Sequence, residues 1–159
     1  MDFTSDKTTD VPDETLNSGD FFPDISLRHY QQSMLTDGKV TTERLRHALV
    51  NAITEVNREL ADWKRSQTAA GFASLEAVPA DHINNDSELM LLYRRAVYSG
   101  AKATLTERYR DTDTTGSGEK KAAALSETVD DLWRDMQWAI QRISGCSGRR
   151  PVSLNGHWN

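Results

Sequence analysis

Residues 42–63, TERLRHALVNAITEVNRELADW, carry the pattern that most clearly indicates a helical fold. Its apolar residues recur at intervals of three and four, a spacing that is typical of one buried face of an α-helix. These residues are Leu45, Leu49, Ile53, Val56, Leu60 and Trp63. Thr41 or Thr42 can cap the start, and Gly71 is a natural stop. The pattern predicts one long helix of about 28 residues, about 40 Å in length.

Two later segments show the same spacing and predict two more long helices. One runs from Asp86 or Ser87 to about Asp111, and the other from about Glu119 to Ser144. Their apolar positions are Leu89, Leu92, Tyr93, Ala96, Val97, Gly100, Ala103, Leu105 and Tyr109, then Ala122, Leu125, Val129, Leu132, Trp133, Met136, Ile140 and Ile143. Glycine inside a helix costs up to ~1 kcal/mol relative to alanine. Gly100 therefore indicates that another helix approaches closely there.

The connecting segments predict short elements and loops. Residues 25–35 favour a short helix that Asp37-Gly38 stops, and residues 72–86 favour a packed loop around Pro79. No alternation of useful length for a β-strand occurs outside residues 151–154. Phe21-Phe22 precedes these segments, and we expect one ring to anchor the chain to the core while the other stays free for a neighbour.

The chain is predicted to be an all-α bundle of three long helices and one or two short ones, with two extended arms. Residues 1–20 are expected to form an acidic, disordered arm, residues 21–145 the helical domain, and residues 146–159 a second arm. Residues 1–20 carry six acidic side chains and one lysine, which matches the net charge of −5 of the whole chain. The remainder is close to neutral, which argues against a protein that grips DNA by its charge.

No pattern in the sequence indicates catalysis, a metal or a cofactor. His29, His47, His82 and His157 lie in separate elements, and Cys146 lies among glycine, serine and arginine without a clear histidine arrangement. The polar N-terminus and the absence of a long apolar run predict a protein without a signal peptide or membrane span, made in the cytoplasm. From the residues alone, a helical DNA- or regulator-binding module and a small helix-bundle enzyme stay open as alternatives. Salt-dependent DNA binding would indicate the first, and bound metal the second.

Several blocks of residues, in order along the predicted domain, carry a resemblance to a known family. They are Phe21-Phe22-Pro23-Asp24, Ala69-Ala70-Gly71-Phe72, Val78-Pro79-Ala80-Asp81, Glu107-Arg108-Tyr109-Arg110, Asp131-Leu132-Trp133-Arg134-Asp135-Met136, Trp138-Ala139 and Arg142-Ile143. With these blocks the chain resembles the head completion protein (gpL or GPL) family of temperate contractile-tailed phages. The two arms do not take part in the match.

The resemblance implies a structural, non-enzymatic protein of the virion that acts after DNA packaging. Such a protein is expected to dock under the portal protein, to assemble with copies of itself as a dodecameric ring, and to receive a tail or tail-terminator protein. DNA would pass through the lumen of that ring without specific binding. No catalytic residue and no cofactor come with the resemblance.

Two sets of residues are candidates for these contacts. The C-terminal arm is basic and carries apolar side chains, which suit pairing with a strand or pocket of a partner. The predicted portal-binding residues are Arg149, Arg150, Val152, Leu154 and Trp158. Aromatic residues off the core stripe suit contacts between neighbouring copies. The predicted subunit interface comprises Phe21, Phe22, Tyr98 and Trp138.

Overall fold

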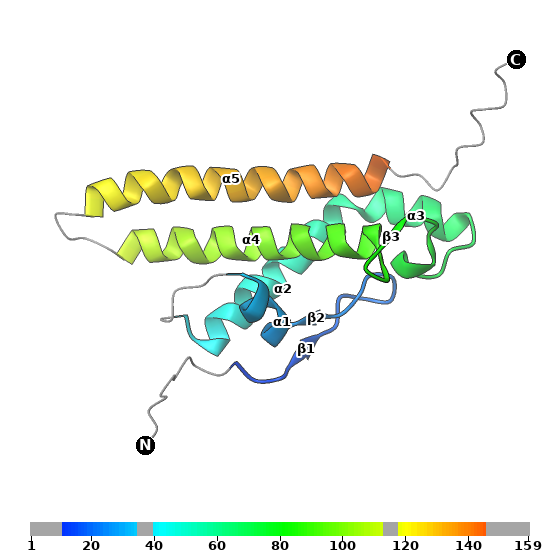
Figure 1. Cartoon of the computed structure of the whole chain (residues 1–159), viewed down its shortest axis with the longest axis horizontal. Helices are drawn as coiled ribbons and strands as arrows, with labels where there is room; N and C mark the ends of the chain where they lie inside the picture. Colours follow the sequence, from blue (N-terminus) through cyan, green and yellow to red (C-terminus); the bar gives the residue numbers. More distant parts are fainter. Residues whose placement is uncertain (1–10, 35–39, 113–117, 146–159) are drawn as a thin grey trace, which may run out of the picture.

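The computed structural model describes residues 11–34, 40–112 and 118–145, with side chains described for all of these except 109–127. The fold is mostly helical, as predicted (Figure 1). The helices are α1 (Leu27–Ser33), α2 (Thr42–Glu59), α3 (Ala61–Ala69), α4 (Glu88–Thr112) and α5 (Gly118–Gly145), with a 3-10 turn at Leu75–Ala77. The strands are β1 (Thr15–Leu16), β2 (Ile25–Ser26), β3 (His82–Ile83) and β4 (Asp86–Ser87), in two antiparallel pairs, β1 with β2 and β3 with β4.

Helices α4 and α5 lie side by side along the long axis of the molecule, and α2 crosses α4 (Figure 1). The predicted apolar stripes meet in the core between these three helices. Of the stripe positions whose side chains are described, all are buried except Trp133, which is partly buried. The sequence periodicity therefore located the core faces correctly.

Gly100 lies where α4, α5 and α2 come together. A Cβ atom at this position would stand 2.9 Å from Met136 Sδ on α5 and 3.6 Å from Ala52 Cβ on α2. Real Cβ atoms do not approach other atoms to less than about 3 Å, because van der Waals repulsion prevents it. The close helix approach that glycine indicated is confirmed.

The prediction of a single long helix up to Gly71 was wrong, because α2 ends at Glu59 and α3 begins at Ala61. Leu60 between them has a ψ of 6°, which departs from helical geometry and redirects the chain. Leu60 is nevertheless completely buried, and Trp63 in α3 packs edge-on against Phe21 at 6.2 Å between ring centroids. The apolar stripe therefore continues through the break, and no proline or glycine marks it. The predicted stop at Gly71 is confirmed by its left-handed φ of 105°.

Residues 11–20 belong to the packed body and not to a disordered arm, which corrects the predicted boundary at residue 21. Val11 is buried, and β1 pairs with β2 just before α1. Glu14 accepts two hydrogen bonds from Arg46 of α2, at 2.7 and 2.6 Å. This bidentate pair lowers the pKa of the Glu14 carboxyl, chiefly through its hydrogen bonds. At least one acidic side chain of residues 11–20, that of Glu14, therefore pairs with a specific residue of the helical body, Arg46.

Both phenylalanines of the Phe21-Phe22 pair are buried, so the expectation that one stays free was wrong. The segment is a bend and not a helix, so adjacent side chains can both reach the core. Phe22 stacks on Tyr93 of α4 at 4.7 Å between ring centroids. The Phe21 carbonyl accepts a hydrogen bond from the Leu75 backbone N–H at 2.9 Å.

The connection between α3 and α4 is packed, as expected, but it also contains a hairpin that was not predicted. Leu75 and Val78 are buried, while β3 and β4 flank a two-residue turn at Asn84-Asn85. Both asparagines have positive φ, 53° and 70°, as a type I′ turn requires. This asparagine pair is the sequence signal that could have revealed the hairpin.

Candidate interaction surfaces

Three of the four side chains predicted at a subunit interface are enclosed by the chain's own core. Phe21, Phe22 and Tyr98 are at most 5% exposed. Tyr98 packs edge-on against Tyr30 of α1, at 5.3 Å between ring centroids, and its hydroxyl lies 2.7 Å from His29 Nδ1 in a hydrogen bond. Burial raises the pKa of Tyr98 to about 12. Phe22 and Tyr98 link the N-terminal segment and α1 to α4, while Phe21 packs on Trp63 of α3.

Of the four residues predicted at the subunit interface, Trp138 is the one that is exposed and can contact a neighbouring copy. It lies on α5 outside the core stripe and is 41% exposed. Arg95 of α4 lies over its ring at 4.6 Å from the centroid, and Arg142 of α5 at 5.1 Å. Stacking on an aromatic face attracts a guanidinium group through the ring quadrupole. We call Trp138, Arg95 and Arg142 the Trp138 platform.

Two contacts between helices lie beside the Trp138 platform. Asp135 lies 3.5 Å from Arg95 and draws that guanidinium toward α5. Gln137 donates a hydrogen bond to Glu59 at 3.0 Å, which links α5 to the end of α2. The exposed aromatic ring therefore sits on a framework of three helices, which reduces the ordering cost of binding.

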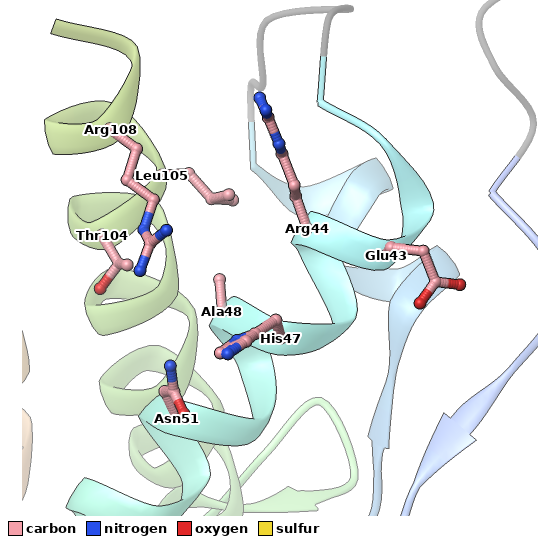
Figure 2. Close-up of a pocket in the computed structure, with 8 residues that line it drawn as sticks. All are labelled: Glu43, Arg44, His47, Ala48, Asn51, Thr104, Leu105 and Arg108. Carbon is pink, nitrogen blue, oxygen red and sulfur yellow. The ribbon is translucent and has the colours of Figure 1, made fainter. Parts of the chain in front are cut away.

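A hollow with a volume of about 360 Å³ lies between α2 and α4. Figure 2 shows side chains from both helices around it. We call it the α2–α4 hollow, and it is lined by Glu43, Arg44, His47, Ala48, Asn51, Thr104, Leu105 and Arg108. The predictions from sequence did not include it, because its residues lie on two helices and only the crossing of these helices brings them together.

A second hollow, of about 300 Å³, lies beside α1 and the start of α4 and includes Tyr98 in its lining. Arg95 belongs both to this lining and to the Trp138 platform. Asp86 lies 3.7 Å from Arg94 on its edge. The charges on this side of α4 are therefore largely paired.

The histidine, cysteine and acidic side chains of the described residues do not form a metal site. Among the described residues, no three histidine, cysteine, aspartate or glutamate side chains are grouped so that they could hold an ion. His82 instead lies with its Nδ1 3.2 Å from the Ala80 carbonyl. No described helix is long and apolar enough to cross a membrane.

Comparison with known proteins decides the family. The family described as phage head completion protein (GPL) matches residues 16–152. The chain belongs to this family of phage head completion proteins. Its members are structural proteins of the phage head and not enzymes.

Two relatives of this head completion protein illustrate the match. The head completion/stabilization protein of Escherichia phage P2 is 43% identical over 125 residues, which are 79% of this chain and 74% of that protein. The probable head completion/stabilization protein of Haemophilus phage HP1 is 28% identical over 103 residues, 65% of this chain and 69% of that protein. No solved structure matches the chain.

The predicted portal-binding arm lies outside the described residues. This applies to Arg149, Arg150, Val152, Leu154 and Trp158, and also to Cys146. The family match includes Val152 but ends there. The assignment of these residues to portal binding therefore stays a prediction from the sequence.

Proposed function

We propose that this head completion protein is an adaptor between the filled head and the tail. It docks under the portal after DNA packaging, and copies of it join side by side in a dodecameric ring. The tail or a tail-terminator protein then attaches to that ring, which helps to retain the DNA. Membership of a head completion family supports this role. A helical body that exposes an aromatic side chain outside its core supports it as well.

The exposed Trp138 platform is the main structural support for the proposed ring of copies. A ring subunit needs side chains that are not consumed by its own core, and Trp138 is one of three large hydrophobic side chains exposed among the described residues. Tryptophan and arginine are enriched at the energetic centres of protein interfaces. The platform joins both kinds on two adjacent helices. We assign it to the contact between neighbouring copies.

The charge of the chain fits a ring through which DNA passes. The net charge is −5, and residues 1–20 hold six acids against one lysine, so the remaining residues balance to about zero. Tight binding to phosphates needs many uncompensated cations, because it is driven by the release of counterions. The body, residues 11–145, holds 21 acidic side chains against 16 basic ones, so it carries no excess of cations that would hold DNA in the lumen.

The C-terminal arm, residues 146–159, is the part we assign to the portal. Its apolar residues Val152 and Leu154 alternate with polar ones, and Trp158 follows near the end. An extended segment of this kind can add to the edge of a partner's sheet by main-chain hydrogen bonds, with its large side chains in pockets.

Deleting residues 146–159 tests this assignment. The truncated protein should keep its helical circular dichroism spectrum and lose binding to the cognate portal in co-sedimentation. A full-length variant with Val152→Asp and Leu154→Asp should lose binding in the same way, since it keeps the arm but not its apolar contacts. Truncated protein that binds the portal as well as the full chain would contradict the assignment.

A further inference from the structure

The α2–α4 hollow carries positive charge that the described part of the chain leaves unpaired. Arg44 and Arg108 line it, and neither side chain has an ion-pair partner among the residues whose side chains are described. Glu43, the acidic residue of the lining, points away from Arg108 (Figure 2) and is bound to Arg46 at 2.6 Å. Among the residues whose side chains are described, no carboxylate pairs with either guanidinium group, so both suit an incoming anion.

The shape of the hollow favours a peptide over DNA. Ala48 and Leu105 contribute apolar surface between the two arginines, and His47 and Asn51 contribute polar groups (Figure 2). A volume of about 360 Å³ can take one or two side chains. A DNA backbone needs a row of cations along a surface, whereas a carboxylate needs one guanidinium fork. An acidic segment with an apolar side chain matches both the charge and the lining.

The chain itself contains such a segment in residues 1–10. It carries Asp2, Asp6 and Asp10 against Lys7, and Phe3 is its large apolar residue. It joins the described body at Val11, whose carbonyl lies 3.5 Å from Arg28 Nη2.

A series of ion pairs links the start of the described chain to Glu43, one of the residues that line the hollow. Glu14, three residues after Val11, binds Arg46, which in turn binds Glu43 on the rim of the hollow. Ten residues of extended chain span up to ~33 Å, so the segment is long enough to reach the hollow of its own or a neighbouring copy.

We infer that the α2–α4 hollow is the docking site of residues 1–10. Carboxylates of the segment pair with Arg44 and Arg108, and Phe3 covers the apolar surface of Ala48 and Leu105. This contact holds the acidic segment against the body, in the free protein as well as in the assembled particle. It does not depend on the portal, so its failure would leave the proposed adaptor role untouched.

Limited proteolysis of the full chain tests the inference. Trypsin cleaves after Lys7, and mass spectrometry can follow the initial loss of residues 1–7. Cleavage of a docked segment proceeds through its released form. The double variant Arg44→Gln, Arg108→Gln should release residues 1–7 about five-fold faster, because two exposed ion pairs of ordinary strength are removed. Phe3→Ala should also accelerate release, since it removes the apolar contact four residues away from the cleaved bond.

The matched control is Arg65→Gln with Arg134→Gln, which removes the same charge from exposed ion pairs elsewhere. Equal release of residues 1–7 from the hollow variant, the control and the unmodified chain would overturn the inference. Loss of binding to a short DNA duplex in the hollow variant, with unchanged release, would also overturn it and show a phosphate site. Release that is independent of concentration would place the segment in the hollow of its own chain, as inferred, whereas release that accelerates on dilution would contradict docking in the free monomer.

Discussion

At the scale of single residues, Gly100 shows what a sequence can predict about packing. A glycine inside an otherwise regular helix needs a compensating reason, and the three-helix contact at Met136 and Ala52 supplies it. Tyr98 shows the opposite case. Its position beside the core stripe suggested an exposed aromatic residue, but α1 covers that face of α4 through Tyr30. Periodicity within one helix cannot reveal which further element covers its flank.

Substitutions of increasing size at Gly100 should show a graded loss of stability. Gly100→Ala should change the free energy of unfolding by less than about 1 kcal/mol, because gained helix propensity offsets a shift of the Met136 sulfur. Gly100→Leu should lower it by about 3 kcal/mol, because the added carbons must separate α4 from α5. Urea denaturation followed by circular dichroism measures both. A Gly100→Leu protein as stable as the unmodified chain would contradict the close approach.

At the scale of elements, the three- and four-residue spacing located the helical faces, but not every boundary. The stripe from Leu45 to Trp63 runs without interruption across Leu60, so nothing in it marks the change of direction between α2 and α3. After the break, Trp63 of α3 packs on Phe21, which is a tertiary contact. The two hairpins were not predicted from the sequence, for a different reason. Strands of two residues are too short for alternation to be visible, and only Asn84-Asn85 signalled a turn.

The surface of the α4–α5 pair leads to a prediction about assembly. Trp138→Ala should lower the free energy of unfolding by less than about 1 kcal/mol, because the ring is substantially exposed. It should nevertheless reduce the number of copies that assemble on the cognate portal, because it removes the centre of the Trp138 platform. Mass photometry of portal complexes measures the number of copies.

Val50→Ala is the matched control for that experiment. Val50 is also an exposed apolar residue, 44% exposed, but it lies on α2 and has no arginine stacked on it. Its replacement should leave both stability and assembly nearly unchanged. Equal assembly of the Trp138→Ala and Val50→Ala proteins would exclude the platform from the contact between copies.

At the scale of the whole molecule, the helical fold class and the family could be predicted from the sequence. The Trp138 platform and the α2–α4 hollow could not. The Trp138 platform needs Arg95 from α4 and Arg142 from α5, and the hollow needs Arg44 and Arg108 from two crossing helices. Such juxtapositions arise only from tertiary packing. The acidity of residues 1–20 was visible in the sequence, but the pairing of Glu14 with Arg46 required the fold.

Light scattering of the purified protein, alone and mixed with its cognate portal ring, tests the adaptor role most directly. The free protein should be a helical monomer, and mixing it with the portal should give a complex enlarged by a ring of copies. A protein that stays separate from the portal under all conditions would contradict the adaptor role, while leaving the helical fold and the family in place.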